Sequence, residues 1–285
     1  MGKIVRALSD TGGVFCAAID ATDMVIEIAK LHEASPAATA ALGRMAAAAS
    51  LMGSMLKYEG DRLTVKINGG GKCGVLTAVS DYRGNVKCCA GDPKADAEDV
   101  ESLIGCDGQL TVIKDMGLKE PYIGQIPLSS GNIAQVLTEY YSISEQLPTV
   151  FTLGILFDEG TKVKAAGGYM VQVVPPISDD AVKTLDENLA NMDEIGKMLE
   201  QGFTPEKIAL KALSGLGGEI LDEWQAGYHC DCSRERTESI LVSLGRKELA
   251  RLAEEQETTE VCCHFCNKKY VFSSEDMLKM LKRGV

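Results

Sequence analysis

Four cysteines in the last fifth of the chain form two close pairs. Cys230-Asp231-Cys232 is followed, after thirty residues, by Cys263-His264-Phe265-Cys266. Two pairs of thiolates are what a tetrahedral Zn²⁺ site requires. Four sulfur ligands leave no vacant position for water, which disfavours hydrolytic zinc catalysis. The spacing therefore predicts one Zn²⁺ per reduced chain, bound by Cys230, Cys232, Cys263 and Cys266, and it predicts no enzymatic active site at this position.

The residues alone leave two interpretations of this site open. In the first, zinc only folds the surrounding segment. In the second, the site also senses oxidants, because each half holds two sulfurs close enough in sequence to form a local disulfide, and such a disulfide would destroy the site. This pairing makes us favour the redox-sensing interpretation.

Several neighbouring side chains are weaker candidates. Cys262 is placed outside the ligand set, because the two-residue spacing between Cys263 and Cys266 suits a zinc knuckle better. His229 and His264 adjoin the cysteines, but four thiols already fill the coordination sphere. The cysteines of the first half are expected to be small buried side chains; they are Cys16, Cys73, Cys88, Cys89 and Cys106.

Composition narrows the class of protein. A hydrophobic fraction of 45% with 25% charged residues is typical of a globular protein rather than a disordered or membrane-embedded one. The first ten residues lack the apolar stretch of an export signal, so we expect a cytoplasmic protein whose ten cysteines stay reduced. The net charge is -12 and no segment is strongly basic, so neither nucleic acid nor a membrane is an expected partner.

The elements that must position the cysteines lie in the last sixty residues. Ser233 is a candidate N-cap for a helix that ends near Gly245, and a second helix covers residues 246–256. This helix pair can fold back and bring the two cysteine pairs together. A short strand at residues 270–272 and a terminal helix follow. So few large apolar groups make a thin core, which a structural metal would help to fold.

The rest of the chain reads as a larger domain and a connector. From Leu63 to about Val174, short β-branched strands alternate with Gly-, Asn- and Asp-rich turns, and Ser35-Pro36 begins a helix that runs to about Lys57. Pro175-Pro176 ends this part, and an acidic, glycine-punctuated helical stretch follows. We predict an α+β fold with a mixed sheet-and-helix core domain at 1–177, a helical linker at 178–225 and a zinc-binding module at 226–285.

Taken together, these residues resemble a known family. The segment Cys230-Asp231-Cys232-Ser233-Arg234-Glu235-Arg236, followed by Cys263-His264-Phe265-Cys266-Asn267 and Tyr270-Val271-Phe272, is similar to the C-terminal zinc module of the redox-regulated heat-shock holdases, the 33 kDa chaperonin family. Upstream, Ser80-Asp81-Tyr82-Arg83-Gly84-Asn85-Val86 and Ala166-Gly167-Gly168-Tyr169-Met170-Val171-Gln172 resemble the core domain of that family. The likeness covers nearly the whole chain.

The resemblance implies an ATP-independent chaperone, or holdase, that binds unfolding client proteins under oxidative stress. It implies a zinc-bound, reduced form that is inactive. Oxidation would form the disulfides Cys230–Cys232 and Cys263–Cys266, release zinc, loosen the linker and expose a surface for clients, and the active form would be a homodimer. Loss of thiolate ligands and of the folding energy that the metal supplies gives this switch a physical basis.

Two other classes of protein fit this sequence less well. A zinc-module transcription factor needs a basic face for phosphates, whereas residues 226–285 carry 10 basic and 10 acidic side chains. A thiol oxidoreductase could use Cys263 and Cys266, but no thioredoxin-like βαβ pattern surrounds them. The sequence therefore favours the chaperone.

Overall fold

The computed structural model describes residues 2–283, which divide into two compact units, one that ends at His229 and one that begins at Cys230. We call the first unit the body and the second the cysteine module, and each is described by itself. Two antiparallel five-stranded sheets with helices form the body, and a two-stranded sheet with helices forms the cysteine module. This confirms the predicted α+β class.

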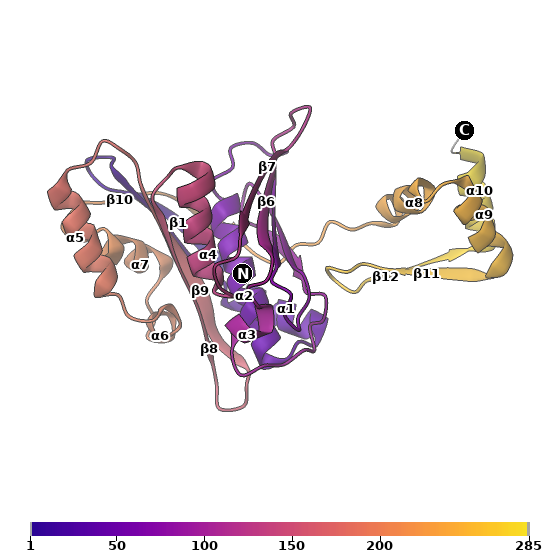
Figure 1. Ribbon diagram of the computed structural model, residues 1–285, viewed down its shortest axis with the longest axis horizontal. Helices are drawn as coiled ribbons and strands as arrows, with labels where there is room; N and C mark the ends of the chain where they lie inside the picture. The colour runs from indigo at the N-terminus through magenta and orange to yellow at the C-terminus, as the bar shows by residue number, and fades with distance from the viewer. Residues whose placement is uncertain (1, 284–285) are drawn as a thin grey trace. The chain divides into compact units, whose positions relative to one another are not determined.

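Sheet A of the body has the strand order β10-β1-β2-β9-β8 (Figure 1). Side chains alternate across its strands, so that Phe15 and Ile19 of β2 lie in one core while Cys16 and Ala18 lie in another. The sheet is therefore buried on both faces. Its strands are β1 (Gly2–Leu8), β2 (Val14–Asp20), β8 (Thr149–Phe157), β9 (Val163–Val173) and β10 (Glu219–Ala226).

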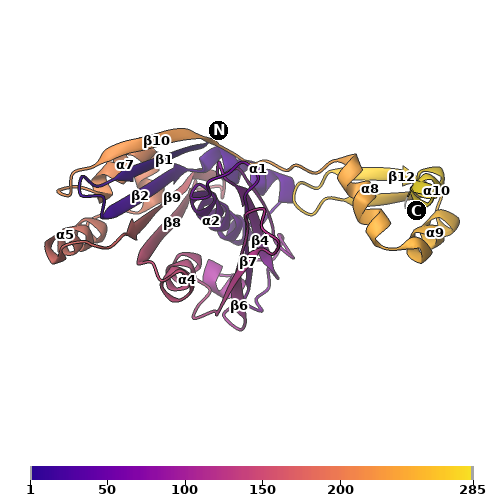
Figure 2. The ribbon, with the colours of Figure 1, turned by 90° about the horizontal axis from the view of Figure 1, so that it is seen from above.

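Helix α2 (Pro36–Gly53) lies between sheet A and sheet B (Figure 2). The Ser35 side chain caps it by accepting a hydrogen bond from the backbone N–H of Ala38 at 3.1 Å, as the sequence predicts. Its alanine-rich surface is buried almost all round, which is the pattern of a helix inside a core. Sheet B, with the order β5-β4-β3-β6-β7, comprises β3 (Arg62–Asn68), β4 (Leu76–Asp81), β5 (Val86–Cys89), β6 (Gln109–Asp115) and β7 (Tyr122–Pro127).

Shorter helices complete the inner part of the body. Helix α4 carries the N-cap Asn132, whose side chain accepts from the backbone N–H of Gln135 at 3.2 Å. A π-helical turn, Tyr141–Glu145, continues it. The helices are α1 (Thr22–His32), α3 (Val100–Ile104) and α4 (Ile133–Tyr140).

Three further helices pack on the outer face of sheet A, and we call them the outer helices (Figure 1). They are α5 (Asp179–Ala190), α6 (Ile195–Glu200) and α7 (Pro205–Ala212). α5 buries a single residue, Leu185. Helices α6 and α7 bury several residues each, among them Met198 and Ile208. Lys3 of β1 forms an ion pair with Glu206 of α7. The outer helices therefore cover an apolar sheet face with a modest number of anchors.

The segment after the outer helices differs from the helical linker that the sequence predicts. Residues 219–226 form β10, which pairs with β1 so that Ala226 lies opposite Gly2 and Glu219 opposite Leu8. Arg6 of β1 donates through Nε to Asp222 of β10 at 2.7 Å. Within the predicted helical linker, α5 ends at Ala190 and α6 begins at Ile195, so the helices are separate.

The cysteine module has the three helices and the strand around residues 270–272 that the sequence predicts, and a second strand, β11, that it does not. Ser233 caps α8 by accepting a hydrogen bond from the backbone N–H of Arg236 at 3.2 Å. Strands β11 and β12 pair antiparallel, with Val261 opposite Tyr270. The elements are α8 (Arg234–Ser243), α9 (Arg246–Glu255), β11 (Thr258–Cys262), β12 (Lys269–Ser273) and α10 (Ser274–Arg283).

Candidate metal centre

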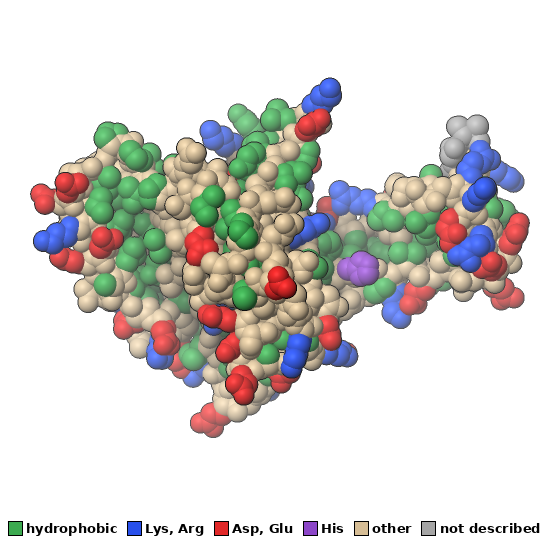
Figure 3. Space-filling model, in the orientation of Figure 1, with side chains coloured by type: hydrophobic (Ala, Val, Ile, Leu, Met, Phe, Trp, Pro, Cys, Tyr) green, Lys and Arg blue, Asp and Glu red, His purple; other side chains and the backbone are tan. Residues whose placement is uncertain are grey.

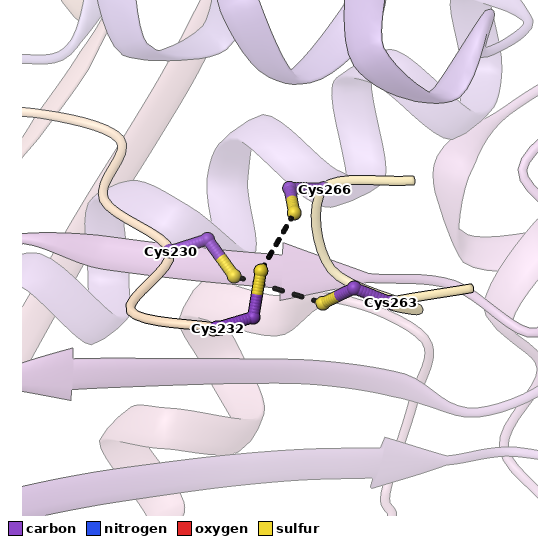
Figure 4. Close-up of side chains that lie close together, drawn as sticks. All are labelled: Cys230, Cys232, Cys263 and Cys266. Atoms are coloured by element: carbon purple, nitrogen blue, oxygen red, sulfur yellow. Dashed lines mark hydrogen bonds between the residues drawn. The ribbon is translucent and has the colours of Figure 1, made fainter. Parts of the chain in front are cut away.

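The two cysteine pairs come from separate segments of the cysteine module (Figure 4). Cys230 and Cys232 lie in the irregular segment before α8, and Cys263 and Cys266 lie in the tight turn between β11 and β12. Two backbone hydrogen bonds close that turn, from the N–H of Asn267 to the carbonyl of Cys263 at 2.8 Å and from the N–H of Cys263 to the carbonyl of Lys268 at 2.9 Å. Asn267 adopts a left-handed conformation with φ of 57° within this tight turn, a conformation that asparagine tolerates better than most residues do.

The four sulfur atoms form one cluster that is able to hold a metal ion. All four lie within 4.8 Å of one another. Across the halves, the Sγ atoms of Cys230 and Cys263 are 3.7 Å apart and those of Cys232 and Cys266 are 3.3 Å apart. A tetrahedral zinc with Zn–S distances of about 2.3 Å places its ligands about 3.8 Å apart. The donor set and its spacing therefore fit Zn²⁺.

Burial affects the thiols unequally. Burial raises the pKa of Cys230 well above the usual range and that of Cys266 to about 11, so both thiols hold their protons at neutral pH without a cation. Burial also acts to raise the pKa of Cys232, but hydrogen bonds from Tyr270 and from the neighbouring thiols outweigh it and lower the pKa. A divalent cation would supply the charge that releases the remaining protons, which couples metal binding to pH.

The charged side chains beside the cluster have partners of their own. Arg234 donates to Asp276 at 2.9 Å and lies 4.2 Å from the ring centre of Phe272. Arg236 pairs with Asp231. Lys269 pairs with Glu260 at 2.9 Å. Lys268 lies over the ring of Tyr270, whose hydroxyl donates to Cys232 Sγ at 3.1 Å. Tyr270 is not among the site residues predicted from the sequence.

The weaker candidates lie apart from the cluster. Within residues 2–283 the cluster of metal-ligating side chains consists of the four cysteines, so Cys262, His229 and His264 are outside it. Cys262 is exposed, and the backbone of His229 belongs to the body, where its N–H donates to Val86.

The cysteines of the body are mostly as predicted. Cys16, Cys73 and Cys88 are buried, and burial raises the pKa of each thiol, to about 12 for Cys16. Cys89 is half-buried. The prediction is wrong for Cys106, which is exposed because it lies in the loop between α3 and β6. None of the five belongs to the metal-ligating cluster found among the described residues.

The body also carries an apolar hollow of about 410 Å³. Met52, Met55 and Leu56 line one side, and Met116 and Leu118 of the hairpin between β6 and β7 line the other. Figure 3 shows hydrophobic side chains gathered below the charged tip of this hairpin.

Of the helices in the described part of the chain, none has the length and apolar character needed to cross a bilayer.

Comparison with known proteins gives full-length matches. The model of the family described as Hsp33 protein matches residues 2–273. The 33 kDa chaperonin of Clostridioides difficile (strain 630) is 43% identical, with 98% of each chain covered, and that of Alkaliphilus metalliredigens (strain QYMF) is 39% identical over the same shares. A crystal structure of the 33 kDa chaperonin of Thermotoga maritima has a TM-score of 0.89 and 32% identity, covering 99% of this chain and 98% of that one.

Proposed function

This chain belongs to the Hsp33 family, a family of chaperonins and not of enzymes, and we propose that it is a redox-regulated, ATP-independent holdase for unfolding proteins. In the reduced, inactive form it binds one Zn²⁺ through Cys230, Cys232, Cys263 and Cys266. The observation that carries the proposal is the convergence of two sequence-local thiol pairs on one cluster.

The metal completes the folding of the cysteine module. The buried hydrophobic residues of this module are Leu241, Leu249, Tyr270, Phe272, Met277 and Met280. So small a core leaves little folding free energy, whereas a structural zinc site contributes on the order of 10 kcal/mol. The zinc also joins the segment before α8 to the turn between β11 and β12.

Oxidation removes the ligands in pairs. A disulfide between Cys230 and Cys232, and another between Cys263 and Cys266, would turn thiolates into neutral sulfurs that no longer bind zinc. Each bridge needs only a local movement, because its two cysteines lie in one segment. The module then loses both its metal and most of its stability.

The outer helices transmit this change. We retain the three functional parts, a core domain at 1–177, a linker at 178–225 and a redox module at 226–285. Only residues 227–229 separate β10 from Cys230, so unfolding of the module releases the chain directly after a strand of sheet A. When the linker loosens, the face of sheet A that includes Cys16, Tyr169 and Val171 becomes available to clients. Membership of a chaperone family implies that the protein binds client proteins. We further propose that its active form is a homodimer and that it acts in the cytoplasm.

The test is an aggregation assay without ATP. Chemically denatured citrate synthase is diluted into buffer that contains the full-length protein, either reduced with one equivalent of zinc or treated with hydrogen peroxide at raised temperature. We expect suppression of light scattering only by the oxidised protein, together with release of one zinc per chain measured with a chromogenic chelator. A Cys106→Ser variant, which removes an exposed thiol outside the cluster, is the matched control and should behave as the unmodified chain does.

Two results would count against the proposal. Equal suppression by reduced and oxidised protein would mean that the cluster does not regulate the activity. Zinc release without any gain in suppression would leave the metal with a purely structural function.

A further inference from the structure

Tyr270 of β12 is packed beside the sulfur cluster without being a ligand. Its side chain is 8% exposed and belongs to the small core of the cysteine module. Its hydroxyl donates a hydrogen bond to Cys232 Sγ at 3.1 Å. The pairing of Tyr270 with Val261 of β11 fixes the backbone on which the ring is carried. The hydroxyl is therefore held in place by the hairpin and by the core.

The ring also has a cation above it. Nζ of Lys268 lies 5.3 Å from the centre of the Tyr270 ring. A cation over the ring face draws electron density from the phenol and makes the hydroxyl a better hydrogen-bond donor. The acceptor, a thiolate when the site binds zinc, carries negative charge in a half-buried place, where a charge-assisted hydrogen bond is strong.

We propose that Tyr270 is a positioning residue of the metal centre, which holds Cys232 in the ligand set and protects its sulfur from hydroperoxides. The proposal rests on the assignment of the four cysteines as zinc ligands. Hydrogen-bonding partners of metal ligands typically change metal affinity 10- to 100-fold. Donation to sulfur also withdraws the electron density that makes a thiolate nucleophilic, so Tyr270 sets how much oxidant Cys232 tolerates.

The step that Tyr270 slows is the attack of sulfur on peroxide. The Cys232 thiolate attacks one peroxide oxygen, the O–O bond breaks, and hydroxide leaves while the sulfur becomes a sulfenic acid. A second thiolate, that of Cys230, then attacks this sulfur, forms the S–S bond and displaces a second hydroxide. Two sulfurs are oxidised by two electrons in total, and the peroxide is reduced by two. The hydrogen bond opposes the first attack, since donation from the Tyr270 hydroxyl withdraws electron density from the sulfur that must form the S–O bond.

The same hydrogen bond makes the core of the module respond to the state of Cys232. A sulfur in a disulfide is neutral and a weak acceptor, so oxidation leaves the Tyr270 hydroxyl without its strong partner in a buried place. A buried donor that loses its partner destabilises the fold around it. Phe272 lies on the same strand and Met277 at the start of α10, so the loss reaches the centre of the core.

The experiment compares the full-length protein with Tyr270→Phe, which keeps the ring and removes the hydroxyl. Cobalt is the probe, because its thiolate charge-transfer bands report on electron donation by sulfur. We expect about tenfold weaker Co²⁺ binding in competition with a chelator, charge-transfer bands displaced to lower energy, and selectively faster oxidation of Cys232 by hydrogen peroxide in mass-mapped time courses. Phe272→Leu, which thins the same core without touching the hydroxyl, is the matched control.

Each outcome decides the matter. Charge-transfer bands at the same energies as in the unmodified chain, together with a Cys232 oxidation rate within twofold of its value there, would overturn the proposal. So would a Tyr270→Phe variant in which all four thiols react faster to the same degree, as in Phe272→Leu, because Tyr270 would then act only through packing. Failure of the unmodified protein to bind Co²⁺ would reject the metal site itself, and this inference with it. None of these measurements reads chaperone activity, so the inference can fail while the proposed holdase function stands.

Discussion

The body and the cysteine module are stabilised by different means. In the body, sheet A is buried on both faces and α2 is enclosed between two sheets, so apolar packing runs through the whole unit. In the module, the core is a single small cluster beside four cysteines. If the module depends on a metal for its fold, as we propose, a change in sulfur chemistry can unfold this unit while the body keeps its structure.

The largest effect is expected from Cys263→Ser. Loss of one ligand weakens zinc binding, and the module loses most of a contribution on the order of 10 kcal/mol. Hydrogen exchange followed by mass spectrometry should show fast exchange throughout residues 230–283 and unchanged protection in sheet A. Cys262→Ser, at the exposed neighbouring position, is the control and should leave both units protected. Slow exchange across the module of Cys263→Ser would remove the distinction drawn between the two units.

A smaller effect, on the body instead of the cysteine module, is expected from Leu51→Ala. Leu51 of α2 is completely buried between the sheets, and truncation of such a side chain costs about 2–5 kcal/mol. Urea unfolding should show a lower midpoint for the body, while zinc affinity stays unchanged. Ile26→Ala, at a position 45% exposed, is the control and should leave the midpoint near that of the unmodified chain. A loss of zinc affinity in Leu51→Ala would mean that the module depends on the core of the body.

The smallest effect concerns the docking of α7. Burial acts to raise the pKa of Glu206, but hydrogen bonds from Lys3 and Thr204 outweigh it and hold the pKa at about 2. A carboxylate with a lowered pKa stabilises the folded form above its ordinary pKa of 4.5, and this stability is lost as the pH falls towards 2. Glu206→Gln should therefore weaken docking by about 1 kcal/mol or less at pH 6 and hardly at all at pH 2.

Hydrogen exchange of residues 205–212 measures this difference. The ratio of the exchange rate in Glu206→Gln to that in the unmodified chain should exceed one at pH 6 and approach one at pH 2. Glu33→Gln removes a more exposed ion pair, Glu33 with Lys94 at 2.9 Å, and should leave this ratio at one. A ratio that is the same at both pH values would show that the charge of Glu206 does not hold α7.

Local signals in the sequence predicted much of this structure. Ser35 and Ser233 cap helices where their side chains and the following residues predict. The two cysteine spacings predicted a single cluster, because each pair fixes the direction of two sulfurs and four sulfurs suffice for one metal. These predictions hold because the interactions that produce them lie within a few residues along the chain.

Interactions between distant segments could not be predicted in this way. Residues 219–226 form β10 because they pair with β1, which is more than two hundred residues away along the chain but offers a free sheet edge. Their acidic composition gives little sign that they form a strand. The break between α5 and α6 falls inside a continuous apolar stripe. Tyr270 gave one usable signal, since a tyrosine on a core strand needs a partner for its hydroxyl. The identity of that partner follows only from the fold.

The connection of the outer helices has a consequence for competition. Residues 174–218 leave sheet A from β9 and return to it as β10, so the outer helices are attached to the same sheet at both ends. They act as an intramolecular ligand for the outer face of sheet A, with an effective concentration on the order of millimolar. If clients bind that face, as we propose, a client at micromolar concentration reaches it only after the affinity of the outer helices has fallen. Because the loop closes without a second molecule, the outer helices redock as soon as that affinity returns.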